Sequence, residues 1–125
     1  METQTNCRVL RLLVVDDHAA ARGGLRLRLS REPDLTIVGE AAAAAEALVL
    51  AASLSPDVIL IDVDLPDGDG IDLLRSLREM LPQARCVILT LDDTPQQRSR
   101  ALSTGAIGFV GKHEPTDVLL AAIRG

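Results

Sequence analysis

Three carboxylates, a hydroxyl and an ammonium group lie along the sequence where they could carry out phosphoryl transfer. Each follows a short apolar run: Asp16 and Asp17 the first, Asp62 the third, Thr90 the fourth and Lys112 the fifth. Carboxylates that lie close together repel one another, so such a group is tolerated where a cation sits among them. Oxygen ligands favour Mg²⁺, which binds through a few carboxylates and a phosphate group. The lysine could then bind phosphate oxygens as a point charge, and an aspartate could be the nucleophile.

Each of these signals is weak when it is taken alone. An aspartate after a strand is usually a turn or cap residue, and a lysine in a loop is usually solvated. His18 and His113 lie next to two of the positions, and we interpret both as surface residues. The joint pattern is specific, because acidic, hydroxyl and basic residues follow four of the five runs in the order that one shared site requires.

Strand-like and helix-like segments alternate along the chain. Apolar, β-branched runs predict strands at 9–15, 36–38, 58–61, 87–89 and 108–110, and helical composition predicts helices at 19–30, 43–54, 71–81, 95–103 and 115–123. This alternation predicts one α/β domain, a parallel sheet with helices on both faces. Ligands of such a sheet bind beyond the carboxyl ends of its strands, so we expect the residues above to meet at one edge.

One segment gives conflicting signals. Leu25, Leu27 and Leu29 alternate with arginines in a period of two, which is typical of a strand. However, Leu25 and Leu29 are also one helical turn apart, and parallel strands need a crossover, usually a helix, between them. We therefore predict a helix.

The composition limits the possible functions. The chain has 125 residues, a formal net charge of −5 and one aromatic residue, a phenylalanine. An acidic chain with so few aromatic residues is poorly suited to bind nucleic acid by itself. Cys7 and Cys86 have no metal-ligand spacing and predict a reducing compartment. Without a membrane-spanning apolar run or a signal-peptide pattern, we expect a cytoplasmic protein that does not associate with a membrane.

Four motifs resemble those of the receiver domains of bacterial two-component response regulators. They are Leu13-Val14-Val15-Asp16-Asp17-His18, Asp62-Val63-Asp64-Leu65-Pro66-Asp67-Gly68-Asp69-Gly70, Leu89-Thr90 and Gly105-Ala106-Ile107-Gly108-Phe109-Val110-Gly111-Lys112. They look most like the NarL/FixJ (LuxR-type) subfamily. The resemblance implies a CheY-like, flavodoxin-like (βα)5 doubly wound fold with strand order 2-1-3-4-5. Residues 9–125 would form the receiver domain and residues 1–8 a flexible N-terminal tail.

The resemblance also implies a phosphorylation-activated signalling switch rather than a turnover enzyme. Asp62 would accept a phosphoryl group from a sensor histidine kinase, with Thr90 and Lys112 as the other catalytic residues. Thr90 would move toward the new phosphate, and Phe109 would then turn inward and reshape the face made by the fourth helix, the fifth strand and the fifth helix. Self-phosphotransfer and autodephosphorylation would be the only chemistry.

The resemblance implies Mg²⁺ as the cofactor. Asp16, Asp17, Asp62 and the backbone carbonyl of Asp64 would hold the ion, with Asp17 as the main acidic ligand. We expect a homodimer on activation. We also expect the chain to be a piece of a longer transcription regulator that binds DNA only through a C-terminal domain absent from this sequence.

Three departures from the family pattern concern the switch. Phe109 stands where tyrosine is commoner, so the switch aromatic has no hydroxyl. Asp64 and Asp92 lie two residues after the acceptor and after Thr90, where they flank the path of the hydrolytic water. We therefore predict an unusual phosphate lifetime, without a sign. Gly111 before the lysine is a third departure and could loosen that loop.

Other functions stay open at this point. Asp62-Val63-Asp64 resembles the nucleophile motif of haloacid-dehalogenase-type phosphatases, but Pro66 replaces their usual Thr or Val, and that class lacks an aspartate pair on the first strand. A pseudo-receiver would keep the fold without the switch, although all five chemical positions are occupied here. A nucleotide-binding site is disfavoured, because acids rather than glycines follow the first strand.

Overall fold

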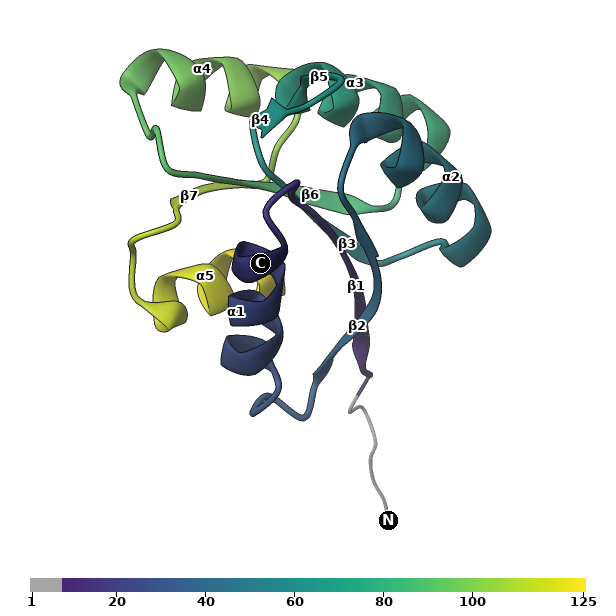
Figure 1. Cartoon of the computed structure of the whole chain (residues 1–125), viewed down its shortest axis with the longest axis vertical. Coiled ribbons are helices and arrows are strands. Elements are labelled where there is room, and N and C mark those ends of the chain that lie inside the picture. The colour runs from purple at the N-terminus through teal and green to yellow at the C-terminus, as the bar shows by residue number, and fades with distance from the viewer. Residues whose placement is uncertain (1–7) are drawn as a thin grey trace.

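A five-stranded parallel sheet forms the centre of the molecule in a computed structural model that describes residues 8–125 (Figure 1). Its strands are β1 (Leu10–Val15), β2 (Leu35–Ala41), β3 (Val58–Ile61), β6 (Arg85–Thr90) and β7 (Gly108–Gly111). The helices are α1 (Ala19–Leu29), α2 (Ala44–Leu54), α3 (Gly70–Met80), α4 (Pro95–Thr104) and α5 (Thr116–Arg124). A separate antiparallel hairpin, β4 (Asp64–Leu65) and β5 (Gly68–Asp69), connects β3 to α3.

The order of the parallel strands is β2-β1-β3-β6-β7. This order corresponds to 2-1-3-4-5 when only the strands of the main sheet are counted, so the predicted flavodoxin-like fold is confirmed. Figure 1 shows α1 and α5 on one face of the sheet and α2, α3 and α4 on the other. The segment with conflicting signals is helical, with Leu25 and Leu29 buried and Leu27 75% exposed. Strand β2 is longer than predicted because it pairs with β1 from Leu35 to Ala41.

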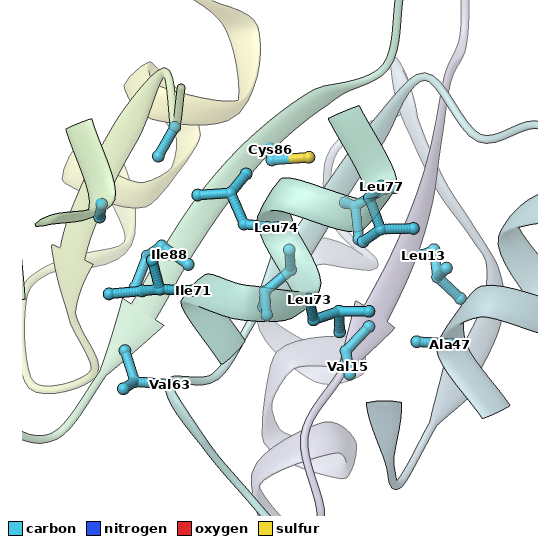
Figure 2. Close-up of a cluster of buried hydrophobic side chains, with 14 of the residues drawn as sticks. Leu13, Val15, Ala47, Val63, Ile71, Leu73, Leu74, Leu77, Cys86 and Ile88 are labelled. Carbon is cyan, nitrogen blue, oxygen red and sulfur yellow. The ribbon is translucent and has the colours of Figure 1, made fainter. Parts of the chain in front are cut away.

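The sheet separates two hydrophobic cores. Strand β3 contributes side chains to both cores, because successive side chains of a strand point to opposite faces. Ile59 and Ile61 pack toward α2, α3 and α4, whereas Val58 and Leu60 pack toward α1 and α5. Figure 2 shows the first of these cores, in which the apolar side of α3 lies over the sheet. A strand buried on both faces is typical of a parallel sheet covered by helices.

The amino-terminal segment and the cysteines concern two further predictions, the flexible tail and the reducing compartment. Residues 1–7, which include Cys7, lie outside the described part of the chain. Arg8, the last residue of the expected tail, places its Nη2 atom 2.6 Å from Oδ1 of Asp57. Cys86 is buried in β6, and burial raises the pKa of its thiol to about 11. Within residues 8–125, no helix combines the length and the hydrophobicity needed to cross a membrane.

Candidate functional site

The carboxyl ends of four adjacent strands bring the predicted residues together. In the sheet, Val15 of β1 lies beside Ile61 of β3, and Thr90 at the end of β6 lies beside Gly111 of β7. The residues that follow these strand ends therefore share one edge of the sheet. Three of these residues are buried, with Asp16 at 2% exposure, Asp62 at 4% and Thr90 at 1%, whereas Asp17 is exposed.

Lys112 joins the two buried carboxylates. Its Nζ atom donates hydrogen bonds to Oδ2 of Asp16 at 2.7 Å and to Oδ2 of Asp62 at 3.0 Å. The lysine is itself held by its main chain, because its N–H group donates to the carbonyl oxygen of Thr90 at 2.7 Å. A cation therefore lies between two acidic residues that are 46 positions apart in the sequence, as the sequence analysis requires.

The environment gives the two carboxylates different acidities. Burial raises the pKa of Asp62 above its usual value, and the hydrogen bond from Lys112 offsets this only in part. Burial acts on Asp16 as well, but hydrogen bonds from Lys112 and from the main chain of His18 outweigh it and lower the pKa of Asp16. Burial would lower the pKa of Lys112, but its two carboxylate partners raise it instead. Asp16 and Lys112 are thus held in their charged forms, and Asp62 is the more basic of the two carboxylates.

A group of side chains beside this pair could hold a metal ion. Asp16, Asp17, His18 and Asp62 each offer one ligand atom, and these atoms lie within 4.8 Å of one another. Three carboxylates fit Mg²⁺, which prefers oxygen ligands. The Asp64 side chain is exposed and is not part of this group, so Asp64 would contribute only the backbone carbonyl that the sequence analysis names. The N–H group of Asp64 donates to Oδ1 of Asp62 at 3.2 Å.

His18 lies closer to the site than the sequence analysis expects. Its side chain is 65% exposed, in agreement with a surface residue, yet its Nδ1 atom lies 3.0 Å from Oδ1 of Asp17 and 3.3 Å from Oδ1 of Asp16. The main-chain N–H of His18 also donates to Oδ1 of Asp16 at 2.9 Å. In the sequence, only its position directly after the aspartate pair indicated that His18 could lie at the site.

Thr90 and the residue two positions later form a local turn. The hydroxyl oxygen of Thr90 accepts a hydrogen bond from the N–H group of Asp92 at 3.0 Å. The Asp92 side chain is exposed, as is that of Asp64. Both acids therefore face solvent. The N–H group of Asp92 contacts the Thr90 hydroxyl, and that of Asp64 contacts the Asp62 carboxylate.

Phe109 is packed inside the protein in this structure. The side chain is 5% exposed, belongs to the core covered by α2, α3 and α4, and lies beside Ile88 in the sheet register. Arg98 of α4 covers the ring. The aromatic side chain therefore points inward in this structure.

Gly70 brings the start of α3 against the backbone of Asp62. A Cβ atom at this position would lie 2.0 Å from the carbonyl oxygen of Asp62 and 2.9 Å from Cα of Val63. The Gly70 N–H also donates to the carbonyl oxygen of Val63 at 2.7 Å. Only a residue without a side chain allows this approach of two backbone segments.

The chain is similar to known regulators of bacterial transcription. The family model "Response regulator receiver domain" matches residues 12–124. The DNA-binding transcriptional activator DevR/DosR of Mycobacterium tuberculosis is 41% identical over 104 residues, which are 83% of this chain and 48% of the relative. The nitrate/nitrite response regulator NarL of Escherichia coli K12 is 38% identical over 111 residues, 88% of this chain and 51% of the relative. The chain thus spans about half the length of these relatives.

The fold is also similar to that of a solved response regulator. A LuxR-family two-component response regulator from Aurantimonas sp. SI85-9A1 superposes with a TM-score of 0.88 at 34% identity, covering 93% of this chain and 83% of that one.

Proposed function

The chain belongs to the response regulator receiver domain family, and on this basis we propose that it is a switch in which Asp62 accepts a phosphoryl group from a sensor histidine kinase. One observation carries the proposal: the Lys112 ammonium bridges Asp16 and Asp62 in a buried site. A lysine at this point can bind an oxygen of the transferred group, while Asp16 keeps it charged. The NarL-type resemblance seen in the motifs agrees with the relatives.

In the proposed reaction, a carboxylate oxygen of Asp62 bonds to phosphorus as the bond from phosphorus to the kinase histidine nitrogen breaks. The imidazole leaves with the electron pair of that bond. The positive charge of Lys112 would offset the negative charge of the transferred phosphoryl group. Asp16, Asp17, Asp62 and the Asp64 carbonyl would hold Mg²⁺, which when bound neutralises charge on the phosphate oxygens.

Thr90 and Phe109 would carry the signal away from the site. The Thr90 hydroxyl oxygen accepts from the Asp92 N–H, and its O–H group could donate to a phosphate oxygen. Movement of Thr90 would change the space beneath α4, where Phe109 packs. Because the added charge must bias an element with two arrangements, we propose α4 and β7 as that element.

The domain that this switch controls would lie outside the present chain. DevR/DosR is described as a DNA-binding transcriptional activator, and we propose a LuxR-type DNA-binding domain as the output here. The proposal includes homodimer formation on activation and a cytoplasmic location, where the kinase would present its phosphohistidine.

Incubation with acetyl phosphate and Mg²⁺, followed by intact mass measurement, tests the proposal. The parent should gain the mass of one phosphoryl group, and Asp62→Asn should gain none. Asp72→Asn is a matched control, because Asp72 is an exposed aspartate on α3 whose side chain pairs with Arg75. Absence of labelling in the parent, or equal labelling of Asp62→Asn, would favour the pseudo-receiver.

A further inference from the structure

Arg22 of α1 contacts the backbone of the aspartate pair. Its Nη1 atom donates a hydrogen bond to the main-chain carbonyl oxygen of Asp16. The Arg22 side chain is largely buried, with 19% exposure, and its Nε atom lies 3.3 Å from Oε1 of Glu40. No motif in the sequence analysis includes this arginine.

The other polar groups of Asp16 are fixed by different partners. Its N–H donates to the carbonyl oxygen of Ala41 at 3.0 Å. Oδ1 accepts from the His18 N–H and Oδ2 accepts from Lys112. The carbonyl oxygen is the remaining polar atom, and Arg22 holds it. Arg22 therefore completes the set of contacts that fix Asp16.

The Asp16 carbonyl also determines where Asp17 lies. It belongs to the peptide unit that joins the two aspartates, and a peptide unit is planar. A donor that fixes this carbonyl therefore fixes the direction in which the chain leaves Asp16. Asp17 is more exposed than Asp16, with 32% exposure of its side chain against 3%. Apart from the exposed His18, whose Nδ1 atom lies 3.0 Å from its Oδ1 atom, the Asp17 side chain is positioned through its backbone.

Glu40 of β2 holds the arginine in turn. It lies beside Val14 of β1 in the sheet register, two residues before Asp16. Its second carboxylate oxygen pairs with Nε of Arg26 at 3.1 Å. Arg26 thus shares the Glu40 partner of Arg22, and its contacts in the described structure do not include Asp16. Arg26 is therefore a matched control for the contact between Arg22 and the Asp16 carbonyl.

We propose that Arg22 is a positioning residue, which orients the Asp16–Asp17 peptide so that both carboxylates can bind a divalent cation. This inference rests on the proposed function. Groups that orient metal ligands without touching the metal typically change metal affinity when they are removed. An arginine that only attached α1 to the sheet would instead change stability and leave affinity unaltered.

The test is a titration of the metal-free protein with Mg²⁺. Binding is measured by isothermal titration calorimetry and by the shifts of the amide signals of residues 16–18 in NMR spectra. Arg22→Met keeps an unbranched apolar side chain and removes the donor, and we expect about 10–100-fold weaker Mg²⁺ binding. Arg26→Met should bind Mg²⁺ as the parent does. Arg22→Lys should recover part of the affinity, because an ammonium can still donate to the carbonyl. Urea unfolding of each variant separates affinity from stability.

Equal Mg²⁺ affinity of Arg22→Met and Arg26→Met would overturn the inference while leaving the proposed function intact. A parent that binds no Mg²⁺ would overturn both. If Arg22→Met does not fold, Arg22→Lys against Arg26→Lys decides the question, since only the first should weaken binding.

Discussion

The guanidinium carbon of Arg98 lies 5.0 Å from the centre of the Phe109 ring. Arg98 is an exposed residue of α4, and Phe109 is a buried residue of β7. A cation over an aromatic face is attracted by the ring quadrupole. Helix α4 and strand β7, which we propose as the switching element, are therefore joined by a contact that needs no tyrosine hydroxyl.

Arg98→Ala should lower the free energy of unfolding by about 0.5–1 kcal/mol, the usual strength of such a contact at an exposed site. The measurement is urea unfolding followed by circular dichroism. Arg98→Lys keeps a cation and should recover part of the loss. Identical unfolding free energies for Arg98→Ala and the parent would show that the arginine contributes nothing to the packing of Phe109.

Gly70→Ala should disturb Asp62, the proposed phosphoacceptor. The new methyl group would meet the backbone of Asp62 and Val63, neither of which can move like a side chain. Overpacking of this kind costs about 1–3 kcal/mol. Labelling by acetyl phosphate should also slow, because the Asp62 backbone must shift.

The control for Gly70→Ala is Gly24→Ala in α1. A Cβ atom at Gly24 meets nothing within 4 Å, and alanine favours a helix over glycine by about 0.5–1 kcal/mol. This variant should be more stable than the parent and should be labelled at the parental rate. Parental labelling and stability for Gly70→Ala would contradict the prediction.

Arg124→Ala should destabilise the protein in a pH-dependent way. Arg124 ends α5 and reaches the turn before β2, with Nη2 2.7 Å from Oδ1 of Asp34 and 2.8 Å from Oε1 of Glu32. The hydrogen bonds from Arg124 hold the pKa of Asp34 below its usual range. A lowered folded-state pKa gives stability that is present above the unfolded value of about 3.9 and is lost as the pH falls through the folded value.

Urea unfolding of the parent and Arg124→Ala should therefore differ at neutral pH, and the difference should shrink below about pH 4. Arg31→Ala is the control, since it removes an exposed arginine close to the same turn but none of these contacts. A difference that stays constant down to acid pH would assign the effect of Arg124 to packing instead.

The half-life of the aspartyl phosphate should change in Asp64→Asn and in Asp92→Ala. Both side chains are exposed, and their N–H groups contact Asp62, the proposed acceptor, and Thr90. Each carboxylate can either bind or repel the hydrolytic water, so its removal changes the rate of hydrolysis. Loss of the phosphate is followed by intact mass measurement, with Asp93→Ala as the control. An unchanged half-life in both variants would rule out a role for these acids.

The alternation of strands and helices was enough to predict a parallel sheet with helices on both faces, whereas the strand order was implied only by the family resemblance. The strand ends were enough to predict which residues meet. The segment from Leu25 to Leu29 shows why: the need for a crossover helix outweighed a local period of two. Burial of one apolar face then placed Leu25 and Leu29 inward.

Contacts between distant segments could not be predicted in this way. Helix α2 has Ala43 at its N-cap, which offers no side-chain acceptor. The cap comes from Asp67, whose carboxylate accepts from the N–H groups of Ala44 at 2.7 Å and Ala45 at 3.0 Å. These hydrogen bonds lower the pKa of Asp67. A local pattern contains no trace of a partner more than 20 residues away.

The same limit applies to Arg22 and Arg98. Both are arginines on helices, where a solvated surface position is the usual interpretation. Whether such a side chain reaches a carbonyl or an aromatic ring depends on how the helix lies against the sheet. The short hairpin β4–β5 is a further case, since each of its strands has only two residues.

Phe109 also gives the molecule a spectroscopic property. It is the one aromatic residue of the chain, and it lies inside a core of aliphatic methyl groups. Any methyl resonance displaced by an aromatic ring current in the folded monomer must therefore arise from a neighbour of this ring, apart from the effect of the two histidines. Those resonances would report the position of the ring at the switch without any label being introduced.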